Sequence, residues 1–134
     1  MSTNTPSEDL RDAVCDGATA QIVELIASGA DVNFIDEDSG WALVLWAVKA
    51  NQVAALDLLL RHGANVNVCD SSGNTALHKA AYLGYGKCVS LLLRHGAAVT
   101  SLNKMQQTPL DLATLFDKPD MATLLSQPST ASST

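Results

Sequence analysis

Residues 70–81 of the chain read DSSGNTALHKAA. Leu77 and the two alanines that end this stretch fall at the spacing of one helix face. Asn74 or Thr75 stands directly before them, where a side-chain oxygen accepts from the free N–H groups of a helix start. Gly84 follows where a left-handed residue ends a helix. The stretch therefore predicts a short, capped helix that stops in a tight turn.

The pattern around this helix recurs along the chain. The hexapeptide SGADVN at residues 28–33 returns as HGANVN at 62–67 and as HGAAVT at 95–100, so that its glycines stand 34 and then 33 residues apart. The alanines in one phase of this repeat are Ala13, Ala47, Ala80 and Ala113. An aliphatic run follows each alanine within one repeat. Four copies of helix, turn, second helix and loop are predicted, and Gly17, Asn51 and Asp117 occupy the turn position of Gly84.

The motif D-x-x-G-x-T-x-L-H-x-A-A at residues 70–81, together with the G-A-x-V-N stretches, resembles the ankyrin repeat over residues 8–126. The resemblance implies an all-α fold: an ankyrin-repeat solenoid of four stacked helix-turn-helix units with β-hairpin-like loops. It also implies a role in protein recognition, with contacts made by the loop tips and the exposed faces of the first helices.

The expected repeats span residues 8–36, 37–69, 70–102 and 103–126, between disordered tails at 1–7 and 127–134. The copies differ in quality. The second reads ALVL at 42–45 where the family prefers Thr-Pro-Leu-His, so it lacks a capping hydroxyl and an imidazole. The fourth has Asp111 in place of the histidine and a last helix expected to begin around Pro119. Atypical end copies suit a solenoid, because each end has one side facing solvent.

The net charge is −6 and unevenly distributed. Residues 1–40 hold nine acidic residues and one basic residue, Arg11, whereas residues 41–134 hold five acidic and seven basic residues. Nucleic acid is therefore disfavoured as a partner, since phosphate backbones are bound by basic surfaces. The acidic repeats are expected to face a basic patch on a partner protein. Alternatively, the acids only keep the protein soluble.

Three cysteines without C-x-x-C spacing (Cys15, Cys69 and Cys88) predict free thiols rather than a disulfide framework. No run approaches the roughly 20 apolar residues that cross a bilayer, so no membrane partner is expected. We expect a monomeric protein of the cytoplasm or nucleus.

Catalytic, metal and cofactor sites are not expected. His62 and His95 occupy one phase of successive repeats, so they form a row at helix ends and complement the helix dipole rather than converge on a metal. His78 is expected to hydrogen-bond loop backbone rather than act as a base. Cys88 is expected in the core, and no histidine approaches it in the pattern. The chain is therefore interpreted as a non-catalytic binding protein.

Repeat phase also indicates which side chains share the exposed side of the first helices and loops. The candidate partner-binding residues are Trp41, Trp46, Lys49, Asn74, Lys79, Tyr82, Leu83, Met105, Gln107, Leu115 and Asp38. Both tryptophans of an aromatic-poor chain belong to this set, and aromatic anchors dominate interface energetics. For Trp46 a second interpretation stays open, in which it packs over the weakened second repeat.

Three functions remain as alternatives. The first is an adaptor or inhibitor that binds a partner protein on the concave face of first helices and hairpins. The second is a targeting or regulatory subunit of a larger complex. The third is a binder of a small phosphorylated ligand or nucleotide, in which Lys49 and Lys79 neutralise phosphate beside Trp46 and Tyr82.

Overall fold

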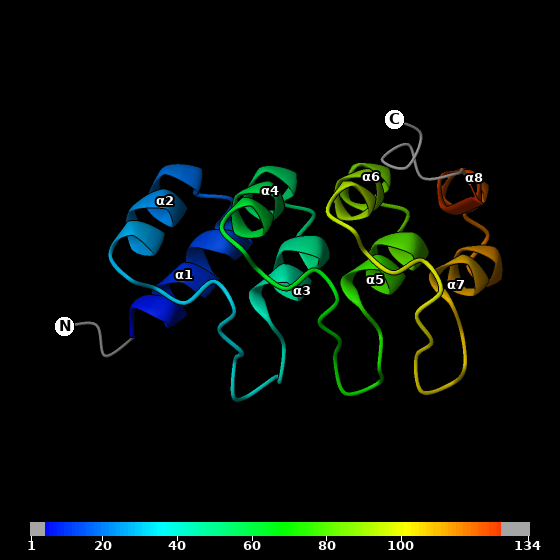
Figure 1. Ribbon diagram of the computed structural model, residues 1–134, viewed down its shortest axis with the longest axis horizontal. Helices are drawn as coiled ribbons and strands as arrows, with labels where there is room; N and C mark the ends of the chain where they lie inside the picture. Colours follow the sequence, from blue (N-terminus) through cyan, green and yellow to red (C-terminus); the bar gives the residue numbers. More distant parts are fainter. Residues whose placement is uncertain (1–4, 127–134) are drawn as a thin grey trace.

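A computed structural model describes residues 5–126 as four pairs of helices (Figure 1). The helices are α1 (Pro6–Asp16), α2 (Thr19–Ala27), α3 (Leu43–Lys49), α4 (Val53–Arg61), α5 (Ala76–Leu83), α6 (Gly86–Arg94), α7 (Pro109–Leu115) and α8 (Pro119–Ser126). The first helix of each pair packs on the first helix of the next pair, and the second helices pack likewise. The prediction of an all-α solenoid of four helix pairs is confirmed.

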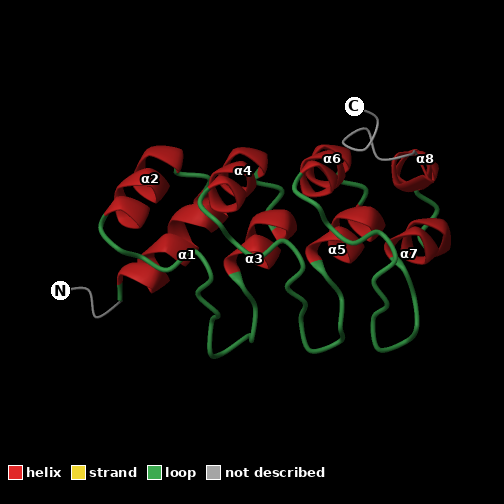
Figure 2. Cartoon of the chain, in the orientation of Figure 1, coloured by secondary structure: helices red, strands yellow, loops and turns green. Residues whose placement is uncertain are grey.

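The helices form two layers, one of α1, α3, α5 and α7 and the other of α2, α4, α6 and α8 (Figure 1). Long loops leave the first layer and project away from both layers, as Figure 2 shows. Within residues 5–126 the only strand-like pairings are the isolated bridges Ile35–Ala42 and Cys69–Thr75. The loops therefore have the course of hairpins without regular strands.

Each helix pair turns at a residue in the left-handed region. The φ angles are +70° at Gly17, +54° at Asn51, +79° at Gly84 and +57° at Asp117. These four positions were predicted from one column of the repeat, and the prediction is confirmed. Because each turn is only a few residues long, the two helices of a pair pack antiparallel against each other.

Small and aliphatic side chains fill the space between the layers. Ala13, Ala47, Ala80 and Ala113 are all at most 2 % exposed. A methyl side chain at this position lets neighbouring first helices approach closely, and leucines of the second helices, such as Leu59 and Leu92, complete the core. Cys88 is buried as expected, and burial raises the pKa of its thiol to about 11.

Polar side chains tie successive repeats together. The Asn33 side chain accepts a hydrogen bond from the backbone N–H of Asn65 at 2.8 Å. Asn67 does the same for Ala98, one repeat further on, at 3.0 Å. The ring of His78 reaches the carbonyl oxygen of Gln107 with its Nε2 atom at 2.8 Å. The expectation that His78 bonds loop backbone is therefore confirmed.

The start of the domain differs from the expected boundary at residue 8. Helix α1 begins at Pro6, because Thr5 and Glu8 form a capping box in which each side chain bonds the backbone N–H of the other. Residues 6 and 7 are therefore helical and not part of a disordered tail. The tail predictions for residues 1–4 and 127–134 lie outside the described residues.

Candidate functional site

Two tryptophans mark the first-helix side of the second repeat. Trp41 precedes α3 and Trp46 lies within it, and their ring centroids are 4.9 Å apart with the planes tilted by 50°. Both side chains are half-buried, so each ring has one part on the core and one part towards solvent. Within residues 5–126 the indole Nε1–H of Trp46 is buried without a hydrogen-bond partner. This aromatic pair is the centre of the candidate surface.

Two lysines lie over these rings from different helices. The Nζ atom of Lys49 lies 5.2 Å from the ring centroid of Trp41 and 5.9 Å from that of Trp46. The Nζ atom of Lys79, on α5, lies 4.1 Å from the ring of Trp41. All three distances are within the range of cation–π attraction. The second and third repeats therefore meet at an aromatic pair held between two ammonium groups.

The two lysines have different roles. Lys79 is only 4 % exposed, and its ammonium donates to a carboxylate oxygen of Asp70 at 2.8 Å. This corrects the expectation that Lys79 lies on the exposed side of α5. The physical reason is that Trp41 and Asp70 enclose it, one as a π surface and the other as a counter-ion. Lys49 is exposed, and no carboxylate of residues 5–126 forms an ion pair with it.

Asp70 is fixed by several donors. Its Oδ1 atom accepts from the backbone N–H groups of Ser72 at 2.9 Å and Asn74 at 3.0 Å. Burial by itself raises the pKa of Asp70, but the hydrogen bond from Lys79, the backbone donors and the charge of Lys79 together lower that pKa. Asp70 therefore stays ionised beneath the aromatic pair.

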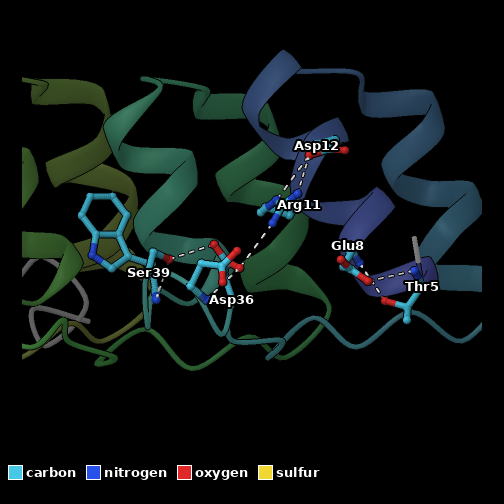
Figure 3. Close-up of polar contacts among 8 residues, drawn as sticks. Thr5, Glu8, Arg11, Asp12, Asp36 and Ser39 are labelled. Carbon is cyan, nitrogen blue, oxygen red and sulfur yellow. Dashed lines mark hydrogen bonds and ion pairs between the residues drawn. The ribbon is translucent and has the colours of Figure 1, made fainter. Parts of the chain in front are cut away.

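A second set of polar contacts positions the loop before Trp41 (Figure 3). Arg11 of α1 lies 3.3 Å from Asp36, and it also pairs with its neighbour Asp12 at 3.1 Å. Asp36 accepts from the hydroxyl of Ser39 at 3.0 Å. The hydroxyl oxygen of Ser39 in turn accepts from the backbone N–H of Trp41 at 3.1 Å. The first repeat is thus connected to the backbone of Trp41 through one chain of contacts.

A second aromatic pair extends the surface towards the last repeat. Tyr82 on α5 and Phe116, which follows α7, have ring centroids 5.2 Å apart. Phe116 is 49 % exposed and its neighbour Leu115 is 67 % exposed. Leu83 lies half-buried beside Tyr82, and Met105 at the tip of the last loop is 78 % exposed. The candidate residues of the third and fourth repeats therefore do present apolar surface to solvent.

The remaining candidates occupy the loops. Asn74 accepts from the side-chain amide of Asn103 at 2.8 Å, and Gln107 accepts from the same amide at 3.0 Å. These side chains join two neighbouring loops and are only partly open to solvent. Asp38 is exposed in the second loop, and its backbone N–H lies 3.4 Å from Oδ1 of Asp36. Of the predicted set, the structure brings Trp41, Trp46, Lys49 and Lys79 into one cluster.

Sequence reasoning left out the residues that organise this surface. Asp36, Asp70 and Asn103 share one phase of the repeat, and each accepts from the backbone N–H two residues further on. That column of Asx turns could have been found from the same spacing that revealed the glycines. Phe116 stands at the repeat phase of Leu83 and packs on Tyr82, but it is not in the predicted set.

Neither a metal site nor a membrane span is found among the described residues. No group of three or more His, Cys, Asp or Glu side chains within 5–126 has an arrangement that could hold a metal ion. None of the helices in this range has the length and apolarity that crossing a bilayer requires. Cys15, Cys69 and Cys88 are free thiols.

Comparison with known proteins gives consistent matches. A family model for ankyrin repeats, which spans three copies, matches residues 10–103 and again residues 46–133. The mouse B-cell lymphoma 3 protein homolog is 40% identical over 72 residues, which are 54% of this chain and 16% of that protein. Chicken inversin is 29% identical over 125 residues, 93% of this chain and 11% of inversin.

A rat Arf-GAP with coiled-coil, ANK repeat and PH domains (protein 2) is 38% identical over 66 residues, which are 48% of this chain and 9% of that protein. The chain thus spans less than a fifth of the length of each of these relatives.

Proposed function

The chain belongs to the ankyrin-repeat family, and we propose that it is a non-catalytic adaptor or inhibitor that binds a partner protein on its first-helix and loop side. Ankyrin repeats indicate a module for protein–protein interaction. The observation that supports this particular face is the pairing of aromatic rings that are open to solvent, Trp41 with Trp46 and Tyr82 with Phe116, on or directly beside the first helices.

The energetics of association favour such rings. An aromatic side chain that is already fixed by its neighbours loses little conformational entropy on binding, and it offers a large apolar area. Trp41 is held by Ser39 at its backbone and by Lys79 at its ring. It is therefore preorganised as an anchor, and truncating it is expected to weaken binding by about 2 kcal/mol or more.

Charge supplies orientation. Asp16, Glu37 and Asp38 are exposed in the first two repeats, whereas Asp12 and Asp36 are paired with Arg11. A partner with a basic patch facing the first two repeats is favoured, with an acidic group opposite Lys49. Binding of a small phosphorylated ligand is less favoured, because Lys79 is already neutralised by Asp70.

The test is an affinity capture from cell extract, read by quantitative mass spectrometry, with three forms of the protein. These are the wild type, the double variant Trp41→Ala/Tyr82→Ala, and Val23→Ala, which removes exposed apolar surface from α2 in the other layer. We expect partners that are retained by Val23→Ala and lost from the double variant. Circular dichroism confirms that each variant is folded. Equal retention by all three forms would reject the proposed face.

Trp46→Ala in the same capture separates the two interpretations of that residue. Loss of partners with an unchanged melting temperature assigns Trp46 to the interface. A melting temperature lowered by several degrees with partners retained assigns it to packing over the second repeat.

A further inference from the structure

We infer a second binding surface on the opposite layer of the molecule, a groove between α4 and α6 that takes an acidic amphipathic helix of a partner protein. This site is separate from the proposed face, because it is built only from second helices. The two helices lie side by side in the layer that points away from the loops (Figure 1). A surface depression of about 780 Å³ lies between them and extends to Leu124 of α8.

The floor of the groove is apolar. Val53 of α4, Leu91 of α6 and Leu124 of α8 line it. Leu124 reaches this position because α6 begins with Gly86. A Cβ atom at Gly86 would lie 3.1 Å from Met121 Cε and 3.6 Å from Leu124 Cδ1. The absent side chain thus lets α8 pack closely and contribute a leucine to the groove.

The walls carry basic groups at both ends. Lys87 and Arg94 lie on the groove side of α6, seven residues and therefore about 10 Å apart along the helix axis. Arg61 of α4 stands at the same repeat phase as Arg94, so the two guanidinium groups share one end of the groove.

The acid of the groove, Asp57, is already engaged. It pairs with Arg61 at 3.0 Å and lies 4.0 Å from His95. Among residues 5–126, no carboxylate lies within ion-pair distance of Lys87 or Arg94. Two cationic groups are therefore available to a ligand in a chain whose net charge is −6.

The basic character is confined to the two central repeats. The first repeat has Ala20 and Ala27 at the phases of Lys87 and Arg94, and the fourth has Asp120 at the phase of Lys87. Helix α2 therefore carries neither charge, and α4 has Ala54 at the phase of Lys87, so the groove between α2 and α4 lacks a counterpart of Lys87. A local cluster of this kind is not a by-product of the repeat, since the repeat does not carry it from end to end.

The shape and charge together define the ligand. Two parallel neighbouring helices form a groove into which a third helix packs along its apolar stripe. Acidic residues two turns apart would meet Lys87 at one end and the arginines at the other. Apolar residues between them would cover Val53, Leu91 and Leu124. The partner is thus a helix with an apolar stripe that is flanked by carboxylates.

The probe is a synthetic, dye-labelled peptide of about 16 residues that is rich in alanine, with leucines at helical spacing and glutamates flanking them seven positions apart. A matched peptide has lysine in place of each glutamate. Fluorescence anisotropy measures the binding of both peptides to the wild type, to Lys87→Ala/Arg94→Ala, and to Lys104→Ala/Lys118→Ala. The last variant loses the same charge outside the groove.

We expect the acidic peptide to bind the wild type and the control variant alike, and to bind Lys87→Ala/Arg94→Ala about 10-fold or more weakly. On addition of the acidic peptide, the amide resonances of the isotope-labelled protein should shift for residues 53–61 and 86–94. The inference would be overturned if the acidic peptide did not bind, if the lysine peptide bound equally well, or if both variants bound the acidic peptide equally. It would also be overturned if the NMR shifts were confined to α3 and α5. Self-association of the protein that Lys87→Ala/Arg94→Ala abolishes would overturn it as well, since a second copy would then fill the groove.

Discussion

The ring of His78 has one hydrogen-bond role for each nitrogen. Its Nδ1 atom accepts from the backbone N–H of Thr75 at 3.1 Å, and its Nε2 atom faces the carbonyl oxygen of Gln107 at 2.8 Å. Nδ1 must therefore be free of a proton and Nε2 must carry one, which is the neutral ring. Burial lowers the pKa of His78, although the hydrogen bond with Gln107 opposes this effect.

A pH dependence of stability follows from this. Since the folded pKa of His78 is lowered, the unfolded state binds more protons once the pH falls below about 6.5. The contribution of His78 to stability is complete above that pH and is lost as the pH falls towards the folded pKa. We expect the free energy of unfolding in urea to decrease between pH 7.5 and pH 5.5, values chosen to lie about one unit either side of the unfolded pKa.

The variant His78→Leu provides the comparison. It is expected to be less stable at neutral pH, because the N-cap of α5 and the carbonyl of Gln107 lose a partner, and its stability should change less over the same interval. Because His62 and His95 are present in both proteins, the difference between the two pH slopes is assigned to His78. The same pH slope in both proteins would contradict the assignment of a neutral, buried imidazole.

At the scale of one element, α3 differs from the other first helices. Thr5, Thr75 and Thr108 each cap a helix with a side-chain oxygen and complete a capping box, whereas Ala42 before α3 has no side-chain cap. The rings of Trp41 and Trp46 pack on the core beside the start of this helix. In the packing interpretation of Trp46, these contacts compensate for the missing cap.

Restoring the hydroxyl tests this interpretation. In Ala42→Thr the new oxygen would accept from the backbone N–H of Leu45, as Thr75 does from His78. We expect the free energy of unfolding, measured in urea, to rise by about 1 kcal/mol. The reverse change Thr75→Ala should lower it by about 1 to 2 kcal/mol. A loss of stability in Ala42→Thr would indicate that the tryptophans occupy the space of the hydroxyl.

Much of the element structure could be predicted from the sequence, because it depends on local chemistry that repeats. The four left-handed turns, the N-cap Thr75 and the start of α8 at Pro119 each follow from residue type and phase. The burial of Lys79 could not be predicted in this way. It depends on Trp41 and Asp70, which come from other parts of the fold, and phase alone assigns a direction but not the neighbours that close over it.

At the scale of the whole molecule, the helices of each repeat pack on the helices of the adjacent repeats. The stability of such an array is close to a sum of repeat and interface contributions. Both tryptophans lie in the second repeat, so their emission reports unfolding of the N-terminal half. Circular dichroism reports all helices. Tryptophan emission therefore follows the N-terminal half of the solenoid, whereas circular dichroism follows all four repeats.

Met121→Ala tests this additivity. Met121 is 6 % exposed on α8, and its methyl group lies against Gly86 of α6. Truncation should destabilise the last repeat by about 2 to 3 kcal/mol. We expect the circular dichroism transition in urea to begin at a lower concentration than the tryptophan transition, whereas the two coincide in the wild type. Equal shifts of both signals would indicate that the four repeats unfold as one unit.

The division of the helices into two layers has a consequence for how two partner proteins could bind at the same time. The first-helix layer and the second-helix layer face opposite directions (Figure 2), so a guest on one side leaves the other side vacant. Two partners bound to opposite layers would be held a fixed and short distance apart. Each would then be present at an effective concentration in the millimolar range relative to the other. The chain would then hold the two partners apart by the thickness of one helix pair. Additional repeats would add binding surface along the solenoid without changing that distance.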